Sequence, residues 1–101
     1  MPARVQKAAG ERPTADELRR RFQAEGMSPR EWGNGPGDTY GWHAHGYHKV
    51  LYCLAGSIVF HTRDDGDLEL DAGDRLDVEP GTDHAATVGP DGVQCIEASR
   101  P

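Results

Sequence analysis

The segment of residues 41–56 places three of the chain's five histidines beside a lysine and an apolar run of strand length. A second segment, residues 73–84, ends on another histidine shortly after a Pro80-Gly81 turn. Neutral imidazole nitrogens are common ligands of divalent transition metals. The two segments are therefore where we look for a metal site.

Strand geometry brings part of this set together. If residues 43–51 are extended, His43, His45 and Lys49 point to one side, because alternate residues of a strand share a face. The two imidazoles then sit about 7 Å apart along the chain, and both can reach one ion at roughly 2.0–2.1 Å. His84 is the candidate third ligand, from a neighbouring strand. Taken alone, a His-x-His pair is more often a surface or supporting pair than a ligand pair.

The two segments taken together resemble the two signature motifs of the cupin superfamily. The first motif, G…HxH…E……G, is matched by Gly41, His43, His45 and Gly56. The second, G…P.G..H, is matched by Gly73, Gly81 and His84, with Glu79 where the first proline commonly falls. The resemblance covers about residues 40–90. It implies an all-β, cupin-type double-stranded β-helix (jelly-roll) barrel with a ligand site inside and frequent homodimers.

The resemblance also implies a ligand set of His43, His45 and His84 for a divalent transition metal: zinc, iron, nickel, manganese or cobalt. The glutamate ligand of the family does not carry over, because Lys49 stands at its position. A protonated ammonium cannot ligate a metal, and burial beside a dication lowers the pKa of a lysine.

Three arrangements of Lys49 remain open. In the first, the three histidines hold the metal together with water or substrate, and Lys49 turns aside or is neutral. In the second, no metal binds, and the histidines and Lys49 form a cationic pocket for an anion. In the third, Lys49 is structural and pairs with a carboxylate such as Glu97, which strand parity allows to point inward. His48 replaces a ligand only if a bulge near Gly46 shifts the register, and we expect Asp83 and His61 to face solvent.

The elements that must position these residues follow from local patterns. Residues 1–13 are expected to be a flexible arm, and residues 14–101 a single domain. Thr14 and Glu17 form a capping-box pattern that starts a helix at about 15–25, and a barrel follows at about 28–98. Short runs separated by turn residues predict strands at residues 49–54, 57–62, 68–70, 75–78, 84–88 and 93–98. The first run is apolar on both faces, which predicts a central strand.

Composition limits the function classes. The chain has 101 residues and a formal net charge of −6, which disfavours binding to nucleic acid because a phosphate-binding surface needs excess Lys and Arg. No run has the length of a signal peptide or membrane span, so we expect a cytoplasmic protein without membrane contact. Cys53 and Cys95 are expected to be reduced, buried hydrophobes.

Two functions are compatible with these residues. One is a metal-dependent enzyme acting on a small anionic polar molecule, with the metal as Lewis acid and Lys49 as acid/base or orienting group. The other is a non-catalytic module that binds or senses a small ligand in the same cavity, with or without metal. Fold alone does not separate them.

Overall fold

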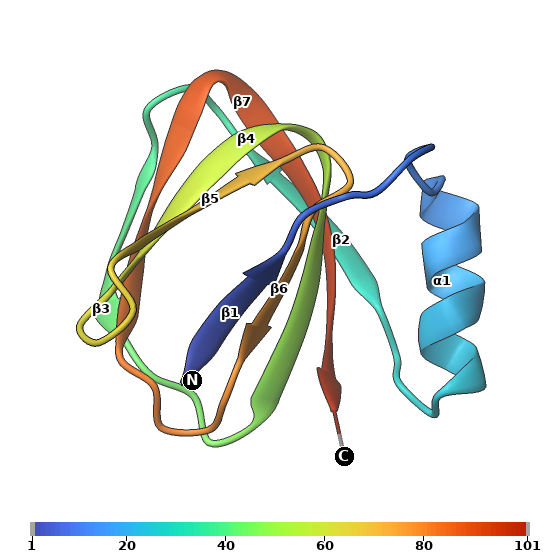
Figure 1. The fold of residues 1–101 in the computed structure, drawn as a ribbon, viewed down its shortest axis with the longest axis horizontal. Coiled ribbons are helices and arrows are strands. Elements are labelled where there is room, and N and C mark those ends of the chain that lie inside the picture. The colour runs from blue at the N-terminus through green and yellow to red at the C-terminus, as the bar shows by residue number, and fades with distance from the viewer. Residues whose placement is uncertain (1, 101) are drawn as a thin grey trace.

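The computed structural model describes residues 2–100 as a barrel of β-strands with one helix beside it (Figure 1). In chain order the elements are β1 (Ala3–Gln6), α1 (Ala15–Ala24), β2 (Arg30–Asn34), β3 (Thr39–His43), β4 (His48–Thr62), β5 (Asp67–Asp71), β6 (Arg75–Val78) and β7 (His84–Arg100). The predicted all-β fold with one short N-terminal helix is confirmed.

The helix begins where the capping pattern places it. The Thr14 side chain accepts a hydrogen bond from the Glu17 backbone N–H, and the Glu17 carboxylate accepts one from the Thr14 backbone N–H. Leu18 and Phe22 are buried against the outer face of the barrel. Burial of each contributes about 1.5–3 kcal/mol, which anchors a helix too short to be stable alone.

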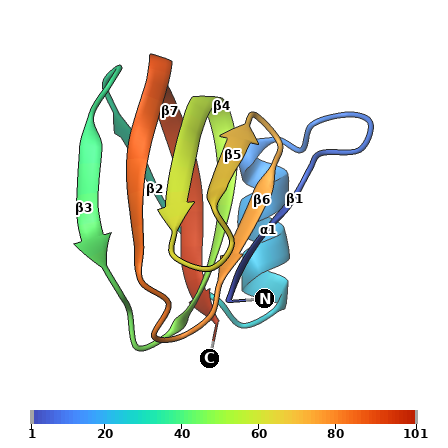
Figure 2. The same cartoon turned by 60° about the vertical axis from the view of Figure 1, so that its left-hand side comes forward.

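The strands form one seven-stranded antiparallel sheet in the order β1-β6-β4-β7-β2, with β3 paired to β7 and β5 paired to β4. The long strands β4 and β7 pair along most of their length. Figures 1 and 2 place β3 and α1 on opposite sides of the molecule. The segment between β1 and α1 crosses from the barrel to the helix (Figure 1).

The prediction of separate strands on either side of residues 55–56 and 89–92 was wrong, because β4 and β7 each run through these positions. The register shifts between Cys53 and Ala55 and again between Gly56 and Ile58, so the paired strands bend without ending. Gly56 has a φ of +74°, and a Cβ there would lie 1.9 Å from the carbonyl oxygen of Gly92. Glycine at position 56 therefore allows the two bent, paired strands to approach each other closely.

The N-terminal arm is also more ordered than predicted. Residues Ala3–Gln6 form β1, which pairs with β6, and Ala3 is fully buried. Strands β1, β2 and β3 were not among the predicted runs. Their sequences are short and largely exposed, so the alternation that marks a half-buried strand is weak there.

Strand β4 separates two apolar clusters, as its sequence predicted. Leu51 and Cys53 face the barrel interior, whereas Val50 and Tyr52 face outward and pack with α1. Cys53 and Cys95 are free and buried, as predicted. Within residues 2–100, α1 is too short and too polar to cross a bilayer, and no other helix is available to do so.

Candidate metal centre

The structure brings together the three histidines that the sequence singled out. His43 is the last residue of β3, His84 is the first residue of β7, and the two are cross-strand partners. His45 lies in the connection between β3 and β4. One ring nitrogen from each of the three lies within 4.8 Å of the others.

The local geometry differs from the one we expected. Residues 44–47 are not a strand, so the extended segment from His43 through Leu51 is interrupted. His43, His45 and Lys49 nevertheless line one cavity. Their convergence comes from the cross-strand pairing of His43 with His84 and the bend around His45, rather than from strand parity alone.

Backbone carbonyls orient two of the rings. The Nδ1 of His43 lies 2.6 Å from the carbonyl oxygen of Gly41, and the Nδ1 of His84 lies 2.9 Å from that of Thr82. A carbonyl only accepts, so each Nδ1 donates and each Nε2 keeps its lone pair in the neutral ring. Such an outer hydrogen bond fixes the tautomer of metal-ligating histidines.

Two ring nitrogens of the cluster are left without partners. The Nε2 atoms of His45 and His84 are buried and make no hydrogen bond within residues 2–100. An unpaired buried polar atom is destabilising by about 1–3 kcal/mol, and a metal ion would relieve this cost. The donor set therefore fits a divalent transition metal bound through imidazole nitrogen.

The surroundings of His45 and His84 favour the neutral form of each ring. Burial lowers the pKa of His45, and the positive charge of Lys49 lowers it further. Burial also lowers the pKa of His84, against the hydrogen bond to Thr82, which raises it. Because a metal competes with protons for the imidazole lone pair, lowered pKa values favour metal binding at neutral pH.

Lys49 lies in the same cavity and pairs with Glu97. Its Nζ is 3.6 Å from Oε1 of Glu97, and the two residues are 8% and 5% exposed. The Trp32 indole N–H donates to the same carboxylate oxygen at 2.6 Å. Glu97 therefore points into the barrel, as the alternation of side chains along its strand allowed. It compensates Lys49 and is not part of the cluster of potential metal ligands.

The cavity has a volume of about 330 Å³, within the usual range for small-molecule sites. Trp32, Tyr40 and Phe60 form its apolar walls, and Arg30 lies on it with Nη2 at 3.8 Å from Glu97. Arg30 was missed at the sequence level. Its position two residues before Trp32 on β2 was the signal, because the two share a strand face.

The remaining histidines lie outside the cluster. His48 lies 3.5 Å from carboxylate oxygens of Asp77 and of Glu79, so no bulge carries it into the cavity. His61 was expected to face solvent but is half-buried, because its ring nitrogens are hydrogen-bonded to Asp67 and Thr87.

Asp83 was also expected to face solvent but is half-buried, and its carboxylate pairs with Arg63. The guanidinium of Arg63 lies 3.6 Å from the ring centroid of Trp42. Trp42 is therefore held away from the histidine cavity, at the surface.

Comparison with solved structures supports the same fold. A chain in the crystal structures of the DMSP lyases RdDddP and RnDddQII matches with a TM-score of 0.69 and 28% identity, over 74% of this chain and 38% of that one. An uncharacterised protein with a double-stranded β-helix domain from Klebsiella pneumoniae matches with a TM-score of 0.64 and 23% identity, over 74% of this chain and 63% of that one. This chain thus spans less than two thirds of either structure. A DUF861 family protein from Thermotoga maritima matches over 94% of this chain and 96% of that one, with a TM-score of 0.61 and 16% identity.

No curated protein matches this sequence significantly. The family profile described as "Cupin domain" matches residues 32–95, which run from within β2 to within β7 and include all three histidines. The match covers more than half of the chain and coincides with the barrel that carries the histidine cavity. The protein is a member of the cupin family.

Proposed function

We propose that His43, His45 and His84 hold one divalent transition metal and that the cavity beside it binds a small anionic polar molecule. The observation that carries the proposal is that two nitrogens of the three-histidine cluster, Nε2 of His45 and of His84, are buried without a hydrogen-bond partner in the described part of the chain. The donor set suits zinc, iron, nickel, manganese or cobalt, and geometry and availability decide among them.

The charge of the cavity supports an anionic ligand. Three neutral imidazoles contribute no negative charge to a bound dication, and Glu97 is already paired with Lys49. A carboxylate or similar oxygen on the ligand would supply the negative charge that a protein glutamate supplies in the family motif. Arg30 adds a further cation beside the cavity.

The chemical role proposed for the site is Lewis-acid activation of the bound molecule by the metal. Lys49 lies in the same cavity, where its ammonium can orient an anionic group or donate a proton to it. Glu97 positions Lys49 and accepts from Trp32, so it sets where that ammonium points. The similarity to a chain of DMSP lyases favours an enzyme.

A second candidate is a non-catalytic module that binds or senses a small ligand. The buried pair of Lys49 with Glu97 favours it, because this pair neutralises the two ionisable groups that stand beside the histidines. Turnover of a small anion by metal-loaded protein, lost in Lys49→Met, would support the enzyme. Ligand binding without turnover would support the sensor.

Elemental analysis tests the metal site itself. We expect the purified protein to contain about one transition metal per chain, as a three-histidine site with open positions predicts. The His43→Ala/His45→Ala variant should lose this metal. His61→Ala is the matched control, because its ring lies away from the cluster. Equal metal content in wild type and double variant would contradict the proposal.

Three further expectations accompany the proposal and stay predictions: a single-domain organisation, a homodimer, and a cytoplasmic location. A domain of this size buries a smaller fraction of its surface on folding than a larger domain does, and is only marginally stable alone. This is the physical reason to expect a dimer. Size-exclusion chromatography with light scattering measures the oligomeric state.

A further inference from the structure

A second cavity lies on the outer face of the barrel, away from the histidines. Its volume is about 440 Å³, and it lies between the segment of residues 6–14, helix α1 and the outward residues of β4 and β6. Tyr52 of β4 forms part of its wall, three residues after Lys49, which lines the inner cavity. Nothing in the proposed metal chemistry uses this outer cavity.

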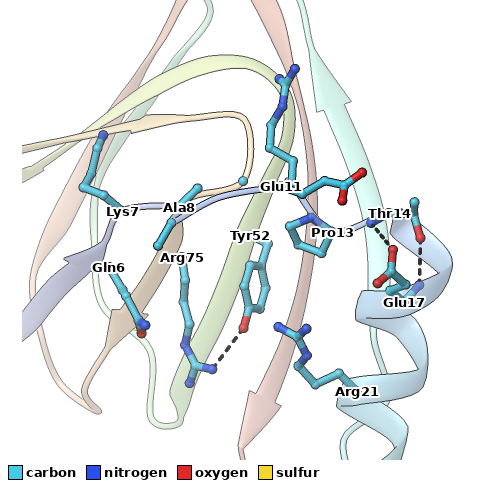
Figure 3. Close-up of a pocket in the computed structure, with 13 residues that line it drawn as sticks. Gln6, Lys7, Ala8, Glu11, Pro13, Thr14, Glu17, Arg21, Tyr52 and Arg75 are labelled. Atoms are coloured by element: carbon cyan, nitrogen blue, oxygen red, sulfur yellow. Dashed lines mark hydrogen bonds between the residues drawn. The ribbon is translucent and has the colours of Figure 1, made fainter.

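The wall of the cavity is built from a buried tyrosine and an arginine (Figure 3). Tyr52 is 7% exposed, and its hydroxyl accepts a hydrogen bond from Nη1 of Arg75 at 3.2 Å. The hydroxyl proton of Tyr52 has no acceptor among the described residues 2–100. Asp77 accepts two further bonds from Arg75, so two of its five N–H donors remain free.

Helix α1 supplies a third donor group. Figure 3 shows Arg21 extending from the helix toward Tyr52 and Arg75. Neither Arg21 nor Arg12, which also lines the cavity, has an ion-pair partner within residues 2–100. The lining of this cavity has four basic residues (Lys7, Arg12, Arg21 and Arg75) against two acidic ones (Glu11 and Glu17), a local departure from the formal net charge of −6.

The other charged groups at the cavity are largely engaged. Lys7 is held by Asp74, with Nζ 2.6 Å from the carboxylate. Glu17 is engaged in the helix cap with Thr14. Glu17 keeps its negative charge in the cap, so Glu17 and the exposed Glu11 are the acidic groups that oppose an anion at this cavity. The free donors therefore come from the Tyr52–Arg75 wall, Arg21 and Arg12, and of the two arginines Arg21 is the one that extends toward this wall (Figure 3).

We propose that this outer cavity is a binding site for a small phosphate-bearing molecule, with Tyr52, Arg75 and Arg21 as its ligands. Three separate donor groups suit the three terminal oxygens of a phosphate better than the two oxygens of a carboxylate. Arginine guanidinium groups bind phosphate with several parallel hydrogen bonds. The volume leaves room for an organic group beside the phosphate.

The test is a titration of the chelator-treated protein with inorganic phosphate, followed by two-dimensional ¹H–¹⁵N NMR at constant ionic strength. The pH is kept at about 8, where inorganic phosphate is mostly the dianion. We expect saturable shifts at the amides of Tyr52 and Arg75 and at the guanidinium of Arg21, and none at His45. A parallel titration with succinate, a dianion with carboxylates only, tests the choice of phosphate.

Variants assign the contacts. Arg21→Ala should weaken phosphate binding about tenfold, as expected for loss of a charge-assisted hydrogen bond. Tyr52→Phe should weaken it about threefold while keeping the ring that packs against Phe22. Arg20→Ala, a neighbouring exposed helix arginine outside the cavity, should change it by less than about twofold.

Three results would overturn the proposal. The first is no saturable shift at phosphate concentrations about ten times a millimolar dissociation constant. The second is equal weakening by Arg21→Ala and Arg20→Ala, which indicates attraction by net charge alone. The third is succinate binding as tightly as phosphate, which would exclude phosphate recognition.

Discussion

Replacing Glu97 with leucine leaves the buried ammonium of Lys49 without its counter-charge. Lys49 is 8% exposed, and Glu97 is its only ion-pair partner within residues 2–100. The same substitution removes the acceptor of the Trp32 indole N–H. Breaking a buried ion pair by removing one partner is destabilising by about 3–5 kcal/mol, a large fraction of the stability of a small domain.

Removal of the other partner is expected to be milder. In Lys49→Met, Glu97 keeps the hydrogen bond from Trp32 and has Arg30 at 3.8 Å. We expect this variant to lose about 2–3 kcal/mol, because a buried carboxylate remains partly compensated. The double variant, Lys49→Met with Glu97→Leu, leaves no buried charge and should be more stable than Glu97→Leu by about 1–3 kcal/mol.

Urea unfolding of the four proteins, with metal removed by a chelator, measures these free energies. Glu69→Leu is the control, because its exposed side chain makes no ion pair within residues 2–100. It should change the free energy of unfolding by less than about 0.5 kcal/mol. Additive losses in the double variant, within about 0.5 kcal/mol, would show that Lys49 and Glu97 are not coupled and would refute the reasoning.

Three further predictions follow from the site and the barrel. Lys49→Glu should tighten metal retention at least about tenfold in chelator competition, because it exchanges a repelling cation for an anionic ligand. Folding lowers the pKa of His45 and His84 below 6.5, so the folded state binds fewer protons. The free energy of unfolding of metal-free protein should therefore fall as the pH drops through about 6.5. Gly56→Ala should destabilise by about 2 kcal/mol or more, and Gly46→Ala, with open space around it, by far less.

Each of these has an outcome that contradicts it. Unchanged or weaker metal retention in Lys49→Glu would show that this position is too far from the metal to ligate it. A free energy of unfolding that is flat between about pH 7.5 and 5.5, or equally steep in His45→Ala, would show that the imidazoles do not set the pH dependence. Equal losses of unfolding free energy in the two glycine variants would show that the close approach of β4 to β7 does not require glycine.

Much of the candidate site was predictable from the sequence. His43, His45 and His84 were named from two short segments, and the structure places them within ligand distance of one another. The helix was predictable too, because a cap is an interaction between residues three positions apart. Apolar residues on both faces of β4 predicted a central strand, because each face packs against its own apolar cluster.

Tertiary structure decided what depends on residues distant in the sequence. The turn-like glycines at 56 and 92 lie inside the continuous, paired strands β4 and β7. Both have a positive φ, and at Gly56 the carbonyl of Gly92 is too close for any side chain. The edge strands β1 to β3 are held by hydrogen bonds to partners far along the chain, which local alternation does not encode. Strand parity allowed Glu97 to point inward, but only the pairing of β4 with β7 sets it beside Lys49. The sequence determined which residues could bind a metal, and the long-range strand pairing decided which charges surround them.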